Sequence, residues 1–187
     1  MRITGGQVKG RNLASPKGLN IRPTSDLVRE AIFDIIGQDL SSQKVLDLFA
    51  GTGSLGLEAL SRGAAFALFI DSSQQSINLI KKNLAICGYQ HSGDILRRNL
   101  RKAIPQNHPQ LRNMFDLVFL DPPYSKDFIP LLVEELLAKD LISAGSYVIA
   151  ESPKTEILPV SFGNLELTDT KVYGGTRISV YEYEANQ

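Results

Sequence analysis

The chain has 187 residues, of which 43% are hydrophobic, and its 20 basic and 20 acidic side chains give a net charge of zero at pH 7. This length suits a single domain, since domains commonly hold about 100–200 residues. The sequence contains no apolar run near the roughly 18 residues that a transmembrane helix needs, and its polar start lacks the features of a signal peptide. The single cysteine, Cys87, excludes an internal disulfide and a thiolate metal cluster. We therefore expect a cytoplasmic monomer without a metal ion or a membrane anchor.

The balanced charge is unevenly distributed along the chain. Residues 1–30 hold six basic side chains against two acidic ones, and residues 95–115 hold five basic side chains and no acidic one. The basic residues of these segments are Arg2, Lys9, Arg11, Lys17, Arg22 and Arg29, followed by Arg97, Arg98, Arg101, Lys102 and Arg112. Local basic clusters on a neutral protein favour a specific anionic partner, although ordinary solvated faces would give the same pattern.

The first part of the chain differs in character from the rest. Residues 1–22 mix glycine, basic residues and short apolar stretches, which predicts a small hairpin or an extended basic arm. An amphipathic helix should follow, with Thr24 or Ser25 as its cap and apolar residues at helical spacing from Leu27 to Ile35. We expect residues 1–187 to form one domain, in which the arm precedes a core over residues 23–187.

Strand and helix patterns alternate through the middle of the chain. Strands are predicted at residues 44–48, 66–70, 95–96, 115–120 and 146–150, and helices at residues 55–60, 77–87 and 129–137. Such alternation implies right-handed crossovers and a mostly parallel sheet with helices on both faces. Two alternating runs at residues 165–173 and 176–183 flank Gly174-Gly175 and predict an antiparallel hairpin at one edge. The sequence therefore predicts an α/β, Rossmann-like fold with a seven-stranded sheet.

A glycine-rich loop follows the first predicted strand. Gly51, Gly53 and Gly56 match the fingerprint of nucleoside-binding loops, and an acid, Asp71, lies 20 residues after Gly51. Glycines let the backbone approach a ligand, and Asp71 can accept hydrogen bonds from both ribose hydroxyls. The residues of this loop that we expect to bind the nucleoside are Asp47, Phe49, Ala50, Gly51, Thr52 and Gly53.

The loop alone does not identify the nucleoside, because NAD and S-adenosylmethionine both suit it. Asp47 favours S-adenosylmethionine, since an acid at this position would attract an ammonium group and repel a pyrophosphate. The chain also has no second half-sheet or substrate domain to hold a nicotinamide and its hydride acceptor. A strand, turn and helix that bind no ligand are the alternative.

A second motif, Asp121-Pro122-Pro123-Tyr124, follows the apolar strand at residues 115–120. The two prolines end the strand and stiffen the turn, since neither can donate a hydrogen bond. The turn holds a carboxylate, a carbonyl and an aromatic ring in an arrangement that suits a flat base with an exocyclic amine. The oxygens would accept hydrogen bonds from the amine while Tyr124 stacks on the base. A simple strand end with a turn-forming Asp-Pro is the alternative.

The two motifs should face one cleft. In an open sheet of this type, ligands bind at the carboxyl ends of the strands, beside the point where the strand order reverses. The glycine loop follows the first strand and Asp121 follows the fourth, so the two sites should meet at that point. Their combination predicts an enzyme that methylates an amino group.

Three segments together resemble the RsmD family of bacterial methyltransferases, which modify the N2 amine of a guanine in 16S ribosomal RNA of the small subunit. These segments are residues 47–53, residues 121–124 and Arg22-Pro23-Thr24-Ser25-Asp26-Leu27-Val28-Arg29-Glu30. The resemblance implies a class I S-adenosylmethionine-dependent methyltransferase fold and, as partner, ribosomal RNA or the small ribosomal subunit. It also implies that Arg22 and Thr24 hold the methionine end of the donor and that Asn99 contacts its adenine.

The expected mechanism depends on how the reacting groups are positioned more than on the strength of an acid or base. The sulfonium donor is already activated, so the enzyme must align nitrogen, methyl and sulfur, which can contribute about 7–11 kcal/mol. Asp121 and the Pro122 carbonyl would stabilise the positive charge that builds on nitrogen. RNA contacts would come from Arg2, Lys9, Arg11, Lys17, Pro123 and Tyr124. A DNA adenine-N6 methyltransferase, a small NAD-dependent oxidoreductase and a nucleoside-binding module are the alternatives.

Overall fold

The computed structural model of the protein describes residues 1–15, 26–105, 108–123 and 128–184. The helices are α1 (Asp26–Ile36), α2 (Ser54–Ser61), α3 (Gln74–Cys87) and α4 (Phe128–Ala138), with short 3₁₀ helices η1 (Leu100–Lys102) and η2 (Pro109–Arg112). The strands are β1 (Lys44–Leu48), β2 (Phe66–Asp71), β3 (Gly93–Arg97), β4 (Phe115–Leu120), β5 (Ile142–Pro153), β6 (Ser161–Phe162), β7 (Leu165–Tyr173) and β8 (Thr176–Tyr183).

The strands form one eight-stranded sheet in the order β3-β2-β1-β4-β5-β8-β7-β6. Strands β1 to β5 pair in parallel, whereas β8 is antiparallel to β5 and β7 is antiparallel to β8. The predicted reversal between the first and fourth strands and the antiparallel hairpin are both confirmed. The sheet has one strand more than the predicted seven, because residues 161–162 pair with β7 as β6. Two residues are too few to show the alternation from which strands are predicted.

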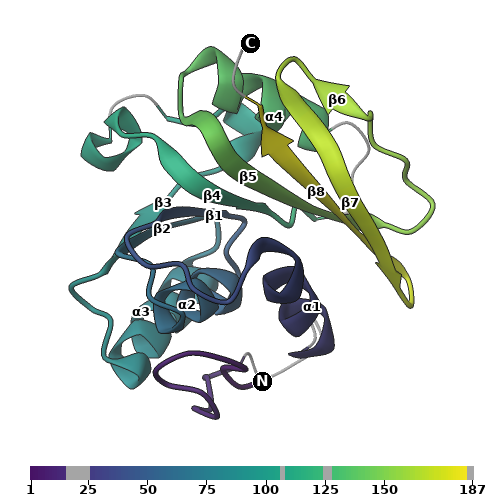
Figure 1. The fold of residues 1–187 in the computed structure, drawn as a ribbon. Coiled ribbons are helices and arrows are strands. Elements are labelled where there is room, and N and C mark those ends of the chain that lie inside the picture. Colours follow the sequence, from purple (N-terminus) through teal and green to yellow (C-terminus); the bar gives the residue numbers. More distant parts are fainter. Residues whose placement is uncertain (16–25, 106–107, 124–127, 185–187) are drawn as a thin grey trace.

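Helices cover both faces of the sheet, as Figure 1 shows. Helices α1, α2 and α3 lie on one face, where Phe33 of α1 contacts Phe119 of β4 edge to face with ring centroids 6.0 Å apart. Helix α4 lies on the other face, where Leu132 packs in one apolar cluster with Leu48 and Leu120. The central strands are buried on both sides, so their sequences are mostly apolar, although β1 contains the buried Asp47. Within the described ranges, no helix combines the length and apolar character needed to cross a membrane.

Residues 1–13 form a small hairpin, one of the two forms expected for the N-terminal segment. The Ile3 N–H donates to the Arg11 carbonyl at 3.0 Å, and the Gly10 N–H donates to the Ile3 carbonyl at 2.8 Å. The hairpin packs against α2, and its Ile3 side chain is buried in the core. The backbone N–H groups of Thr4 and Gly5 donate to the carboxylate of Glu58 in α2 at 2.9 and 2.7 Å. The segment is therefore anchored to the core.

A buried charged network joins this hairpin to α1 and α2. Arg29 and Glu58 are fully buried, and Arg62 is nearly so. Glu58 Oε1 accepts a hydrogen bond from Arg62 Nη2 at 2.9 Å, and Glu58 Oε2 lies 3.7 Å from Arg29 Nε. Arg29 Nη2 also donates to the Arg2 carbonyl. The apolar spacing of α1 predicted a buried Leu27, but this side chain is 62% exposed while Arg29 faces the core.

Candidate active site

The carboxyl ends of the parallel strands bring the predicted motifs to one edge of the sheet. Leu48 of β1 pairs with Ile70 of β2 and with Leu120 of β4, and Leu120 pairs with Ala150 of β5. The residues that follow on these strands are therefore level with one another: Asp71, Phe49, Asp121 and Glu151. We call Asp71, Asp121 and Glu151, together with Asp47 near the end of β1, the carboxylate row.

Sequence reasoning missed Glu151. The apolar pattern ended the fifth strand at Ala150, whereas β5 continues to Pro153 and places Glu151 beside Asp121. A signal was available in the sequence, because Glu151 is an acid directly after a buried strand. Ligands bind in such sheets at the carboxyl ends of the strands, beside the reversal of strand order.

The backbone of the glycine loop requires glycine at several positions. Gly51 and Gly53 have φ values of 55° and 76°, in the left-handed region that side chains disfavour. At Gly56, a Cβ atom would lie 2.4 Å from the Phe69 ring, so only glycine allows α2 to pack this closely on β2. The fingerprint spacing therefore reflects real backbone constraints.

Phe49 has a strained backbone within the same loop. Its φ is 61°, a conformation that costs about 1–3 kcal/mol for a residue with a side chain and that clusters at functional sites. The neighbouring Ala50 N–H donates to the Ile70 carbonyl at 3.1 Å, which fixes the loop to β2. The Phe49 ring packs edge to face against Phe128 of α4, with centroids 5.7 Å apart. This contact connects the loop to the opposite helical layer.

Asp71 holds the glycine loop as well as standing at the predicted ribose position. Its Oδ2 accepts a hydrogen bond from the Gly51 N–H at 2.8 Å, and its Oδ1 accepts one from the Ser73 N–H at 2.8 Å. Each carboxylate oxygen can accept a further hydrogen bond, so two ligand hydroxyls can still bind here.

Asp47 lies inside the sheet beneath the loop. It is 2% exposed, and its Oδ2 accepts a hydrogen bond from the Gly56 N–H in the first turn of α2 at 3.0 Å. Burial raises the pKa of the Asp47 carboxyl to about 7, and the charge of Asp71 adds to the rise, while the Gly56 hydrogen bond opposes it. Asp47 therefore positions the loop, and the charge of the Asp47 carboxyl changes near neutral pH.

Asp121 experiences the same electrostatic environment at the end of β4. Burial raises the pKa of the Asp121 carboxyl well above its ordinary value, and the charges of Glu151 and then Asp47 raise it further. Acids whose charges raise the pKa of a neighbouring carboxyl indicate a site that would be stabilised by a positive charge. The prolines that follow differ in exposure: Pro122 is partly buried and Pro123 is exposed.

A buried asparagine ties the loop to the N-terminal segment. Asn83 of α3 is fully buried; its Nδ2 donates to the Thr52 carbonyl at 2.9 Å, and its Oδ1 accepts from the Ala14 N–H at 2.7 Å. Thr52 Oγ1 also lies 3.6 Å from Met1 Sδ. Asn83 was not predicted, although a polar residue on the apolar face of a helix was the available signal.

The remaining predicted residues are spread more widely. Asn99 is exposed and its Oδ1 caps η1 by accepting from the Arg101 N–H at 3.0 Å. Arg2 and Arg11 lie on the N-terminal hairpin, where Arg2 Nε is 3.8 Å from Asp26 and Arg11 donates to a backbone carbonyl of α3 at 2.7 Å. Lys9 lies on the same hairpin and is exposed. The predicted residues Lys17, Arg22, Thr24 and Tyr124 lie outside the described residues.

Two further findings define the class of protein. The parallel sheet with a reversal between β1 and β4, the glycine loop after β1 and the acid-proline-proline turn after β4 form a class I S-adenosylmethionine-dependent methyltransferase fold. An RNA methyltransferase from Salinibacter ruber, solved in complex with S-adenosyl-L-homocysteine, shares this fold with a TM-score of 0.63 at 16% identity, over 89% of this chain and 96% of that one. Among the described residues, no group of three or more His, Cys, Asp or Glu side chains is placed to hold a metal ion.

The chain belongs to the RsmD family. Its residues 1–182 match the family model described as Conserved hypothetical protein 95. It is 31% identical to Ribosomal RNA small subunit methyltransferase D of Escherichia coli (strain K12), over 99% of this chain and 91% of the relative. The solved structure of the Escherichia coli protein yhhF is similar with a TM-score of 0.86 and 33% identity, over 100% of this chain and 99% of that chain. The resemblance seen in the sequence motifs is confirmed.

Proposed function

We propose that the protein transfers the methyl group of S-adenosylmethionine to the N2 amine of a guanine in ribosomal RNA of the small subunit. The observation that carries this proposal is the carboxylate row. Burial and the charges of neighbouring acids raise the pKa of Asp47 and of Asp121, so this edge of the sheet favours cationic ligands. S-adenosylmethionine supplies a sulfonium and an ammonium group, whereas the pyrophosphate of NAD would be repelled.

The donor would bind along the glycine loop. Asp71 would accept hydrogen bonds from the ribose hydroxyls, and Asp47 would attract the ammonium group. Asn99 would contact the adenine through its amide nitrogen, since its Oδ1 already caps η1. The full set of proposed donor residues is Arg22, Thr24, Asp47, Phe49, Ala50, Gly51, Thr52, Gly53, Asp71 and Asn99.

The target amine would bind at the turn after β4. Asp121 and the Pro122 carbonyl would accept hydrogen bonds from the guanine NH₂, and Tyr124 would stack on a base that has left its helix, a step that requires a few kcal/mol of unstacking. The nitrogen lone pair attacks the methyl carbon, the S–CH₃ bond breaks, and its electron pair remains on sulfur. Positive charge thus moves from sulfur to nitrogen, where Asp121 stabilises it before a proton leaves. The raised pKa of Asp121 makes this carboxylate a suitable acceptor for that proton.

The substrate class is supported by the family. The Escherichia coli relative is named for methylation of small-subunit ribosomal RNA, and it aligns with nearly the whole of this chain. We assign RNA contacts to Arg2, Lys9, Arg11, Lys17, Pro123 and Tyr124, which would hold phosphates and the target base. We further propose a cytoplasmic monomer in which residues 1–187 form one catalytic domain and residues 1–22 its basic arm.

The direct test is product identification. The protein is incubated with labelled S-adenosylmethionine and undermodified small-subunit ribosomal RNA, and the methylated nucleoside is identified by mass spectrometry. N2-methylguanosine is the expected product. Methylation of adenine in DNA, or tighter binding of NAD than of S-adenosylmethionine in a competition assay, would contradict the proposal.

A further inference from the structure

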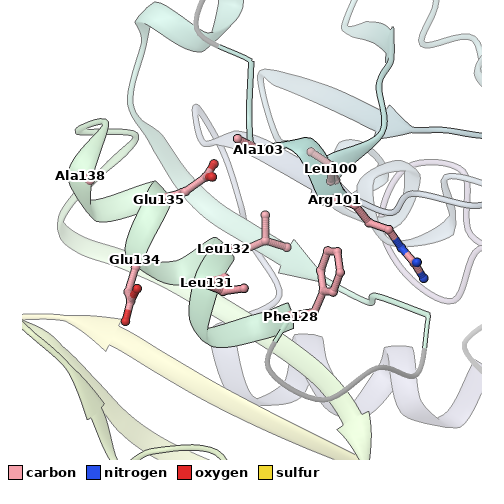
Figure 2. Close-up of a pocket in the computed structure, with 9 residues that line it drawn as sticks. All are labelled: Leu100, Arg101, Ala103, Phe128, Leu131, Leu132, Glu134, Glu135 and Ala138. Carbon is pink, nitrogen blue, oxygen red and sulfur yellow. The ribbon is translucent and has the colours of Figure 1, made fainter.

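A groove lies between η1 and α4 (Figure 2). Its volume is about 310 Å³, near the small end of the roughly 300–1,000 Å³ typical of small-molecule sites. Its floor is apolar, and Leu131 in this floor is 61% exposed. The lining residues are Leu100, Arg101, Ala103, Phe128, Leu131, Leu132, Glu134, Glu135 and Ala138. A groove whose lining is mostly apolar is a candidate surface for binding another molecule.

Phe128 connects this groove to the site of methyl transfer. On one side, its ring packs against Phe49, which is level with Asp121 at the end of the neighbouring strand. On the other side, the Arg101 guanidinium lies 5.8 Å from the centre of the same ring. In Figure 2 the Phe128 ring stands at the η1 end of the row of α4 side chains. The contact between the Phe128 and Phe49 rings therefore connects the groove to the loop beside the predicted acceptor turn.

The η1 side of the groove is positively charged. Arg101 lines the groove, Lys102 follows it in η1, and Arg98 comes just before η1 in the chain. The Arg97 guanidinium instead donates to the Ser72 carbonyl and to Gln74 Oε1. All four side chains are exposed. Exposed cations beside an apolar floor form the pattern by which proteins bind single-stranded nucleic acid, with phosphates on the cations and bases on the apolar surface.

The acids of the α4 side do not cancel this charge. Glu135 is neutralised within the protein, since its Oε2 accepts from Lys139 Nζ at 2.8 Å and from the Ile104 N–H at 2.6 Å. Glu134 lies on α4, on the opposite side of the view from Arg101 in Figure 2. A phosphate beside Arg101 would therefore meet mainly basic side chains.

We propose that this groove binds a nucleotide of the RNA strand next to the target guanine. Its base packs on Phe128 and Leu131, and Arg101 contacts its phosphate. Sequence-specific RNA recognition commonly uses unpaired bases stacked on aromatic and arginine side chains, and Phe128 and Arg101 provide one of each in this groove. The inference rests on the proposed methylation of RNA and adds a second contact that would hold the strand while the target base is displaced.

The test uses two variants of residues that line the groove. Leu131→Asp places a negative charge in the apolar floor, and Arg101→Gln removes the phosphate contact. The matched controls are Ile157→Asp, at an aliphatic residue that is 83% exposed and outside the groove, and Lys81→Gln on the exposed side of α3. Each protein is titrated with undermodified small-subunit RNA at fixed salt and, separately, with S-adenosylmethionine in a calorimeter.

Leu131→Asp should weaken RNA binding by about 5- to 100-fold, the loss expected for one stacked base. Arg101→Gln should weaken it less and reduce the slope of log affinity against log salt by up to about 0.7. Both variants should bind the methyl donor as the wild type does, and both controls should bind RNA as the wild type does. In addition, RNA that contains 4-thiouridine should cross-link on irradiation to a peptide within residues 128–138.

Three outcomes would overturn the inference. RNA affinity equal to the wild type in both variants would remove the groove from the RNA surface, and so would cross-links confined to other segments. A loss of donor affinity in either variant would assign the groove to the donor. Failure of the wild type to methylate the RNA contradicts the proposed function instead, because the binding and cross-linking measurements do not require methyl transfer.

Discussion

The Asp71 carboxylate accepts a hydrogen bond from the backbone N–H of Gly51 at 2.8 Å. The acid that is predicted to bind the ribose therefore also holds the loop that approaches the ligand. Its second oxygen accepts from Ser73, so the side chain is fixed before any ligand arrives. Such preorganisation removes part of the ordering that binding would otherwise require.

Replacing Asp71 should weaken donor binding in two steps. Asp71→Asn keeps an oxygen acceptor but loses the charge, whereas Asp71→Ala loses both ribose contacts and the Gly51 contact. We expect affinity for S-adenosylmethionine to fall in that order, with the alanine variant at least tenfold weaker, since hydrogen bonds to charged groups contribute about 1.5–3 kcal/mol each. Calorimetry measures the effect. Asp116→Ala, at an exposed acid that accepts from the Lys44 N–H, is the matched control. An unchanged affinity in Asp71→Ala would refute the ribose role.

Replacing Asp121 should affect catalysis more than binding. Asp121→Ala removes the charge that stabilises the developing cation, so turnover should fall by about two orders of magnitude or more while donor affinity changes only a few fold. Asp121→Asn separates the contribution of the hydrogen bond from that of the charge, because asparagine keeps an acceptor for the amine but is neutral. Single-turnover methylation at saturating RNA reports both. Near-normal turnover in the alanine variant would mean that Asp121 only shapes the end of β4.

Donor binding should depend on pH through Asp47. The pKa of this carboxyl is about 7 in the free protein, so it is neutral below that pH and negative above it. A cationic donor prefers the negative form, so affinity should rise as the pH increases through 7, and binding near pH 7 should release protons. Calorimetry in buffers with different ionisation enthalpies counts these protons. Asp47→Asn should reduce both the release and the pH dependence, with Asp121 accounting for what remains, and proton uptake in the wild type would contradict the assignment.

The raised pKa of Asp47 also makes the stability of the free protein depend on pH. Stability falls as the pH increases, whereas donor affinity rises. A carboxyl whose pKa is raised on folding stabilises the folded state when neutral, and this contribution is lost as the pH rises from about 4 to about 7. Above pH 7, Asp47→Asn should therefore be more stable than the wild type without donor, by at most about 4 kcal/mol for a shift of this size.

The features that sequence reasoning placed correctly depend on local signals. The prolines that end β4, the glycines of the loop and the apolar strands each act within a few residues, so their spacing alone predicts the edge where they meet. Gly56 shows why the pattern is reliable: any side chain there would collide with Phe69. The reversal of strand order then follows from general rules for parallel sheets.

The features that were missed depend on pairing between distant segments. Glu151 becomes part of the site only because β5 pairs with β4 in a particular register. Arg29 looked like an ordinary charged residue of an amphipathic helix, and only the fold brings Glu58 of α2 to it. Such tertiary contacts leave no periodic signal in the sequence.

The network around Glu58 should be essential for stability. Glu58→Gln would leave two buried arginines, Arg29 and Arg62, without the carboxylate that they share. Removal of one partner from a buried ionic network commonly costs about 3–5 kcal/mol, so we expect a loss of that size in urea denaturation. Glu30→Gln, at an exposed position of α1, should change stability by less than about 0.5 kcal/mol. Equal stability of the two variants would show that the network contributes little.

The basic arm offers the last test, because some of its side chains already contact other groups of the protein. Arg2, Lys9 and Arg11 are all exposed, but Arg2 lies near Asp26 and Arg11 donates to the Ile86 carbonyl. Replacement of Arg2, Lys9, Arg11 and Lys17 by Gln should leave donor affinity intact and lower RNA affinity. The plot of log affinity against log salt should flatten by up to about 0.7–0.9 for each lost phosphate contact.

Comparison with single variants shows which residues of the arm contact RNA. Lys9→Gln alone should account for a larger share of the flattening than Arg11→Gln, since the Arg11 guanidinium already bonds within the protein. Turnover of the fourfold variant at saturating RNA should recover much of the wild-type value, because the arm positions the substrate and takes no part in methyl transfer. If the salt slopes of wild type and fourfold variant coincide, the arm does not contact RNA. The basic residues at the end of β3 and in η1, beside the groove, would then be the main phosphate contacts.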